Sequence, residues 1–257
     1  MSRPTHIALR RGIVAFCRRM NALGLDQGMD GSVSARVAGG LLVTPSARSY
    51  EAMQPEDIVL MDDAGRYDGQ LLPSSEWRLH AAILRERKEA EAVVKVHSPY
   101  ATALACLRLP IPSFHYMVAK AGGSNIRCSA YAAFGSAELA RAMLNALRGR
   151  RACLLANHGM ICFGPDLEHA LLLAAEVEAL AMQYWLARSA GRPVLLSAAE
   201  MQAVAARFRN YGKSPQELPE GFVNPLAPPP RRLLPATKRD AARRRAPVTA
   251  RPRPKRR

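Results

Sequence analysis

The chain has 257 residues, 49% of which are apolar, and this is enough to build a core in one large domain or two small ones. Its formal net charge is +16, and the last 33 residues hold 12 Lys/Arg against one acidic residue. No run of about 18 or more uncharged apolar residues occurs, and the segment MSRPTHIALRRG lacks the apolar core of a secretory signal, so we expect a cytoplasmic protein without a transmembrane segment.

Helix-type and strand-type apolar periods alternate along the first 222 residues and predict one α/β or α+β domain over residues 1–222. The first helix is predicted at residues 5–23, followed by short strands at 33–36 and 40–43 and by a helix that begins near Glu76. Further strands are predicted at 92–97 and 153–157. Two more helices are predicted to end near residues 147 and 188, with caps at residues 135–138 and 166.

Residues 223–257 form a Pro/Arg-rich tail that contains eight of the 19 prolines. Such a composition cannot bury enough apolar surface to offset its ordering entropy, so we expect a disordered basic tail. A tail of this kind can contact nucleic acid or an anionic surface through sequence-independent electrostatics. A solvated appendage without a partner is the other interpretation, since neither aromatic residues nor a folded nucleic-acid motif accompanies the charge.

Four polar groups are candidates for chemistry because they lie at strand ends or turns. His97 ends one predicted strand, His158 follows another, Glu76 opens a helix after two serines, and His115 and Tyr116 share a polar turn. A hydrogen-bonded core residue remains the alternative interpretation of each histidine. Ser74 or Ser75 is the predicted N-cap of the helix that follows, where exposed amides favour an anion.

Seven segments then identify a resemblance: LGLDQGMDGSVSAR, LLVTPS, LLPSSEWRLHAAI, AVVKVHSPYATALA, IPSFHYMVAKAGG, IRCSAYAAFGS and LLANHGMICFG. In this order, over residues 8–215, they resemble the class II aldolase/adducin family, and most of all its members that cleave L-fuculose 1-phosphate. The resemblance implies a three-layer α/β/α fold with a central, mainly antiparallel sheet. It also implies a zinc-dependent aldehyde-lyase that splits a short phosphorylated ketose into dihydroxyacetone phosphate and an aldehyde.

The zinc in this family is held by an H-x-H pair on a strand and by the histidine of an NHG or HHG motif. The resemblance assigns His97 and His158 to this set, but Lys95 occupies the position of the first strand histidine. A lysine amine ligates zinc only after losing a proton, which costs roughly 4–5 kcal/mol at pH 7. We therefore expect one Zn²⁺ per subunit with reduced affinity, with Glu76 as a further candidate ligand.

The resemblance also assigns the other site roles. Glu76 matches the family's acid/base, and Tyr116 matches the tyrosine that serves the aldehyde fragment. Tyr211, in FRNYG, matches an aromatic residue of a segment that covers the pocket. Phosphate would bind to residues of three loops, namely Ser32, Ser46, Ala47, Ser74 and Ser75. Because family members are usually cyclic tetramers with pockets between subunits, we expect a homo-oligomer.

Three interpretations of Lys95 remain open. A zinc enzyme with a weakened site is one. In the second, Lys95 pairs with Glu76 in a metal-free pocket, where the amine stabilises an enolate or forms a Schiff base. In the third, the chain is a non-catalytic binding protein with a basic tail, as adducin is, and a sibling epimerase or decarboxylase is a further alternative. Because Glu76, Tyr116, His97 and His158 keep the residue types that the reaction needs, we favour the lyase.

Overall fold

The computed structural model describes residues 5–27, 29–211 and 219. The tail predicted at residues 223–257, and the boundary predicted after residue 222, lie outside the described residues.

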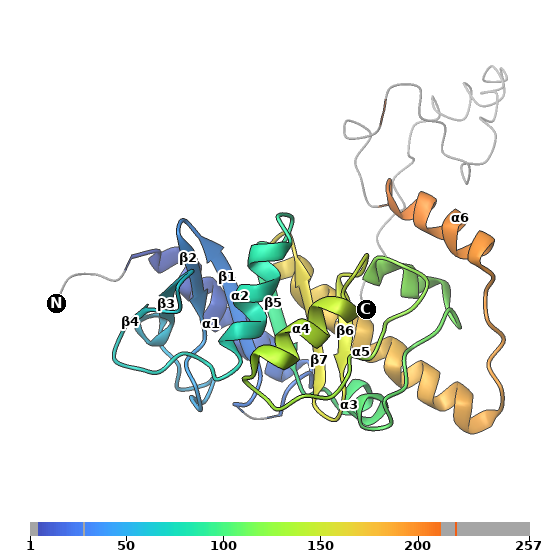
Figure 1. Cartoon of the computed structure of the whole chain (residues 1–257), viewed down its shortest axis with the longest axis horizontal. Coiled ribbons are helices and arrows are strands. Elements are labelled where there is room, and N and C mark those ends of the chain that lie inside the picture. The colour runs from blue at the N-terminus through green and yellow to red at the C-terminus, as the bar shows by residue number, and fades with distance from the viewer. Residues whose placement is uncertain (1–4, 28, 212–218, 220–257) are drawn as a thin grey trace, which may run out of the picture. The chain divides into compact units, whose positions relative to one another are not determined.

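A seven-stranded sheet with strand order β4-β3-β2-β1-β5-β7-β6 forms the centre of the described chain (Figure 1). All six strand pairings are antiparallel, in agreement with the expected mainly antiparallel sheet. The strands are β1 (Ser32–Val37), β2 (Gly40–Val43), β3 (Val59–Asp62), β4 (Tyr67–Asp68), β5 (Ala92–Val96), β6 (Ala152–Leu155) and β7 (Gly159–Gly164).

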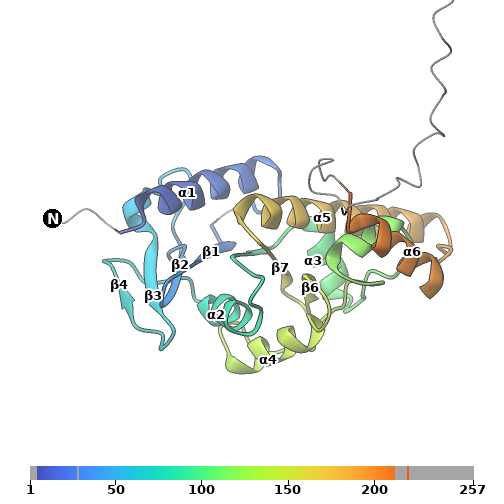
Figure 2. The ribbon, with the colours of Figure 1, turned by 90° about the horizontal axis from the view of Figure 1, so that it is seen from above.

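Helices cover both faces of this sheet, so the predicted three-layer α/β/α fold is confirmed (Figure 2). One core joins the sheet to α1, α3 and α5, and a second core joins the opposite face to α2 and α4. The helices are α1 (Ile7–Ala22), α2 (Trp77–Glu86), α3 (Pro99–Cys106), α4 (Ala137–Ala146), α5 (Leu167–Ala190) and α6 (Ala198–Phe208), with short 3-10 helices at Pro55–Asp57 and Tyr116–Ala121.

Strand β5 shows how the sheet directs polar groups to one face. Val94 and Val96 belong to the core on the α1/α5 face, whereas Val93 belongs to the core on the α2/α4 face. Because side chains alternate along a strand, Lys95 and then His97 share the face of Val93. The amino-terminal end of α2, which carries Glu76, lies over the same face.

Helix α5 has the length and the mean hydropathy of a membrane-spanning helix, and it is the one such helix among the described residues. Its buried positions, such as Ala170, Ala174 and Val177, pack against the sheet in the larger core, and Glu178 reaches across to α3. There it accepts hydrogen bonds from the hydroxyl of Ser98 and from the backbone N–H groups of Tyr100 and Ala101, which open that helix. Core helices of globular proteins have this pattern of contacts.

Each helix and strand predicted from the sequence is present within a few residues of its predicted bounds, but β3, β4, β7, α3 and α6 were not predicted. Strand β7 is buried at all six positions, so it lacks the alternation that marks a half-buried strand. The N-cap of α2 was predicted at Ser74 or Ser75, but it is Glu76. The hydroxyl of Ser74 accepts a hydrogen bond from the backbone N–H group of Glu76. All five cysteines are free thiols.

Candidate active site

The pairing of β5 with β7 brings His97 and His158 together. Val96 lies opposite Met160 in the register, so the residue after β5 meets the turn that leads into β7. The two imidazole rings are nearly parallel, with an interplanar angle of 16° and centroids 5.4 Å apart. Two segments that are 61 residues apart in the sequence thus present a pair of imidazoles at one end of the sheet.

The turn between β6 and β7 has the sequence Asn157-His158-Gly159, and each flanking residue fits its place. Asn157 has φ of 54°, in the left-handed region that asparagine tolerates better than most residues. A Cβ atom on Gly159 would lie 2.4 Å from the carbonyl oxygen of Val96 and 3.2 Å from Cδ2 of His97. The absence of a side chain at Gly159 therefore allows the close approach that places the two histidines side by side.

Glu76 is 4% exposed and faces the histidines from the start of α2. Its Oε1 atom accepts a hydrogen bond of 2.7 Å from the backbone N–H group of Gly135. Its Oε2 atom has no hydrogen-bond partner and lies 3.3 Å from Nε2 of His158. Burial lowers the pKa of His158 to about 4, and the charges of Lys95 and His97 add to this effect, so His158 is neutral at pH 7.

Lys95 is 2% exposed, and its Nζ atom lies 2.7 Å from Nε2 of His97 and 3.3 Å from the carbonyl oxygen of Asp30. Burial lowers the pKa of Lys95 to about 8. The charges of the Glu76, Asp26 and Asp30 carboxylates act in the opposite direction, but the effect of burial is larger. The amine is therefore predominantly protonated at pH 7. An ammonium group has no lone pair, so in this hydrogen bond it is the donor and Nε2 of His97 is the acceptor.

Asp26 holds the other side of His97. Its Oδ1 atom accepts a hydrogen bond from the backbone N–H group of His97 and lies 3.6 Å from Nδ1 of the ring. Oδ2 accepts from the N–H group of Gly31 and from the hydroxyl of Tyr50. Burial opposes the charge of Asp26, but hydrogen bonds from His97, Gly31 and Tyr50 outweigh it and hold its pKa below the ordinary value. A carboxylate on this side favours the proton on Nδ1 and the lone pair on Nε2.

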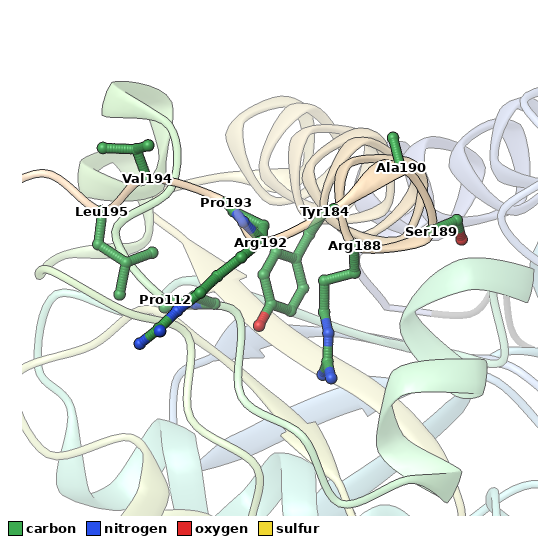
Figure 3. A pocket seen from close by; sticks show the side chains of 10 residues that line it. Pro112, Tyr184, Arg188, Ser189, Ala190, Arg192, Pro193, Val194 and Leu195 are labelled. Carbon is green, nitrogen blue, oxygen red and sulfur yellow. The ribbon is translucent and has the colours of Figure 1, made fainter.

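These groups line a cavity of about 380 Å³. The lining residues are Asp30, Ser75, Glu76, Lys95, His97, Tyr131, Ala132, Phe134, Asn157 and His158. A larger hollow of about 960 Å³ lies at the end of α5 and along the segment that follows it, and is lined by residues such as Tyr184, Arg188 and Leu195 (Figure 3). None of the described residues that line it is Asp, Glu, His or Cys, so the smaller cavity is the better candidate for acid–base chemistry.

Two of the three loops predicted to hold phosphate lie side by side. Pro45 and Pro73 form an isolated antiparallel bridge, the N–H group of Ser46 donates to the carbonyl of Leu72, and that of Ser74 donates to the carbonyl of Thr44. Ser46 and Ala47 are exposed there. Ala47 has φ of 52°, in the region that favours glycine.

Ser32 lies apart from the exposed part of these loops. Its side chain is fully buried, and its hydroxyl lies 2.8 Å from Nε2 of His80, whose Nδ1 lies 2.8 Å from the hydroxyl of Ser34. Burial, with an added effect of the Lys95 charge, lowers the pKa of His80 to about 3. Ser32 also lies directly opposite Lys95 in the β1/β5 register. The uncharged hydrogen-bond network of Ser32, His80 and Ser34 therefore lies next to Lys95 in the sheet.

The two tyrosines assigned by resemblance do not line the cavity of their own chain. Tyr116, at the start of a 3-10 helix, stacks on Phe208 of α6 with ring centroids 6.2 Å apart. Tyr211 packs edge-on against the same Phe208 and is 75% exposed. Tyr116 and Tyr211 thus form one exposed aromatic cluster with Phe208, separate from the lining of the cavity.

The donors in the cavity do not fit the three-imidazole zinc centre. His97 and His158 supply two imidazoles and Glu76 one free carboxylate oxygen, but the amine of Lys95 already donates to the Nε2 lone pair that an ion would need. No group of three His, Cys, Asp or Glu side chains within the described part of the chain is arranged to hold a metal ion.

Several residues of the site were not singled out from the sequence. Asp26 and Asp30 lie in the turn-rich stretch after α1, and Tyr131, Phe134 and Gly135 lie in the irregular segment before α4. Asp26 and Asp30 would have been easier to predict than Tyr131, Phe134 and Gly135. They precede β1, and β1 pairs with β5, the strand that leads to His97. No local pattern marks Gly135 as the hydrogen-bond donor to Glu76, because the two are 59 residues apart.

Comparison with known proteins gives consistent matches. Residues 11–185 match the family described as "Class II Aldolase and Adducin N-terminal domain". A 5-methylthioribulose-1-phosphate/5-deoxyribulose-1-phosphate aldolase of Rhodospirillum rubrum is 50% identical over 82% of this chain and 96% of its own length. An L-fuculose phosphate aldolase of Escherichia coli K12 is 43% identical over 79% of this chain and 95% of its own. A solved L-fuculose 1-phosphate aldolase superposes with a TM-score of 0.76 at 36% identity, over 79% of this chain and 96% of its own.

Proposed function

Since the chain belongs to the class II aldolase/adducin family, we propose that it is an aldehyde-lyase that cleaves a short phosphorylated ketose into dihydroxyacetone phosphate and an aldehyde. The observation that carries this proposal is the carboxylate of Glu76, buried beside His158 with one oxygen free of any hydrogen bond. A carboxylate held in this way is suited to take a proton from a bound substrate and to return it.

The substrate would be a ketose 1-phosphate, because the relatives described above are named for L-fuculose 1-phosphate or for 5-methylthioribulose 1-phosphate and 5-deoxyribulose 1-phosphate. These compounds share the phosphorylated ketone end and differ at the far end, which becomes the aldehyde. Tyr131 and Phe134, which are 59% and 72% exposed, add apolar surface to the cavity lining. That surface supports a substrate with a deoxy or thioether end at least as well as a hydroxylated one.

The remaining roles follow from the placement of the side chains. The adjacent loops of Ser46, Ala47, Ser74 and Ser75 would hold the phosphate beside the start of α2, where backbone N–H groups favour an anion. Ser32 would contribute only if its hydroxyl left His80, so its part in phosphate binding remains a prediction.

Tyr116 and Tyr211 would serve the pocket of a neighbouring copy. Their exposure on one aromatic cluster supports this arrangement and the homo-oligomer expected from the resemblance. Tyr116 would then hydrogen-bond the oxygen of the leaving aldehyde. A cytoplasmic location and a zinc affinity reduced by Lys95 stay predictions of the same proposal.

The test is product formation by the full chain. Purified protein is incubated with L-fuculose 1-phosphate and, separately, with 5-deoxyribulose 1-phosphate, each with and without added Zn²⁺. Release of dihydroxyacetone phosphate is followed through its enzymatic reduction by NADH. We expect release from at least one ketose. A folded protein that releases none from either ketose under any of these conditions would contradict the lyase and favour the non-catalytic binding protein.

A further inference from the structure

Lys95 lines the cavity together with Glu76, His97 and His158. It is almost fully buried, it donates to Nε2 of His97, and the carbonyl oxygen of Asp30 lies within 3.3 Å. The carboxylates of Glu76, Asp26 and Asp30 all attract its charge. A buried cation is stable only when it is surrounded by groups of this kind, so the wall of the cavity is built for one positive charge.

A metal ion and this ammonium group compete for the same electron pair. A ligating imidazole presents its lone pair to the ion, and the Nε2 lone pair of His97 already accepts a hydrogen bond from the ammonium group of Lys95. Moving the amine away would leave a buried charge without its acceptor, keeping the ammonium in place would put two cations beside each other, and ligation by the amine would first require the loss of its proton. Each of these costs opposes binding of a divalent ion between His97 and His158.

We propose that the ammonium group of Lys95 takes the place of the metal ion, so that this site acts on its substrate with a built-in cation. The inference rests on the proposed lyase function and deepens it. The substrate oxygen that receives negative charge would hydrogen-bond to Nζ of Lys95, which has a third proton left after the contacts to His97 and Asp30.

The reaction balances without another reactant. The C3–C4 bond of the ketose breaks, and its electron pair moves onto the carbonyl oxygen at C2 to give an enediolate. Glu76 takes the proton of the C4 hydroxyl as the aldehyde forms, and it then returns a proton to C3 to give dihydroxyacetone phosphate. Lys95 stays protonated throughout and forms no covalent bond, so its contribution is electrostatic.

Zinc binding tests the exclusion of the metal without any need for turnover. The full chain is treated with a chelator, dialysed and titrated with Zn²⁺ against a chromophoric chelator, and zinc bound per chain is confirmed by elemental analysis. We expect Lys95→His to bind one zinc about 100-fold or more tightly than the wild type. The matched control, Lys88→Met, removes an exposed lysine just beyond the far end of α2 and should behave as the wild type. Equal zinc affinity in the wild type and Lys95→His would overturn the proposal.

Activity in the presence of a chelator tests the role of the charge. The wild type should keep its rate, whereas Lys95→Met, which keeps most of the side-chain length without the charge, should lose about 10²–10³-fold in kcat. Circular dichroism melting confirms that the variants are folded. A wild type that is inactivated by the chelator and restored by zinc contradicts the inference but leaves the lyase intact. If no variant cleaves either ketose in any condition, the lyase function fails, while the zinc titration still decides whether Lys95 excludes the ion.

Discussion

The Oε2 atom of Glu76 lies 3.3 Å from Nε2 of His158, and it is a buried oxygen without a hydrogen-bond partner. Because the pKa of His158 is lowered to about 4 by burial, this contact is not an ion pair at neutral pH. The carboxylate therefore keeps one electron-rich oxygen free beside His158, and its other oxygen accepts a hydrogen bond from the N–H group of Gly135.

Glu76→Gln should remove this proton acceptor and leave the fold in place. The amide oxygen can still accept from Gly135, so we expect the midpoint of thermal unfolding to change little, whereas kcat should fall about 10²–10⁴-fold. The measurement is the rate of dihydroxyacetone phosphate release at saturating ketose. Glu138→Gln, at an exposed glutamate in the first turn of α4, is the matched control and should keep the wild-type rate. Full activity in Glu76→Gln would remove Glu76 from the mechanism.

Gly159→Ala should break the approach of the two histidines. The added Cβ would lie 2.4 Å from the carbonyl oxygen of Val96, which belongs to the backbone of β5 and cannot move as a side chain does. We expect a loss of about 1–3 kcal/mol in the free energy of unfolding, measured by denaturant titration. Gly191→Ala is the control, because no atom lies within 4 Å of a Cβ there. Equal free energies of unfolding for the two variants would contradict this prediction and would show that the backbone of β5 shifts to accommodate the added Cβ atom at little cost.

The sequence places each histidine at the end of a strand, because that information is local. Alternation along residues 92–97 puts Lys95 and His97 on one face, and His158 follows the strand predicted at residues 153–157. The pairing of β5 with β7 could not be read from the residues alone, since β7 is a continuous buried strand with no periodic signal. The resemblance supplied only the expectation that His97 and His158 belong to one site.

The surroundings of the pair were less accessible to prediction. The hydrogen bonds of Asp26 to His97 and of Gly135 to Glu76 join segments 71 and 59 residues apart, through loops whose conformation depends on the finished fold. The burial of Ser32 against His80 depends on the packing of α2 on β1. The roles of the individual side chains in catalysis therefore remain predictions, whereas the fold and the family are established.

Ala47→Gly should stabilise the protein, although it removes a methyl group. Ala47 has φ of 52°, a conformation that costs an L-residue about 1 kcal/mol more than glycine. We expect the free energy of unfolding to rise by roughly that amount, as measured by denaturant titration. Ala52→Gly, at an exposed position of the same loop region that lacks a positive φ, is the control and should be destabilised. A loss of stability in both variants would contradict strain at Ala47.

The buried histidine behind Lys95, His80, should make the stability of the fold depend on pH. His80 is hydrogen-bonded between Ser32 and Ser34, and burial lowers its pKa from 6.5 to about 3. Between these two values the unfolded chain binds a proton that the folded chain does not bind. The contribution of His80 to stability is therefore fully present above pH 6.5 and is lost as the pH falls toward 3.

Between pH 7 and pH 5, His80 alone should lower the free energy of unfolding by about 2 kcal/mol. His80→Gln cannot titrate, so its free energy of unfolding should fall by that much less over the same interval, whatever its stability at pH 7. Urea titrations of both proteins at pH 7, 6 and 5 measure the two slopes. Parallel pH profiles would show that His80 becomes protonated without unfolding, and that the network with Ser32 accommodates its charge.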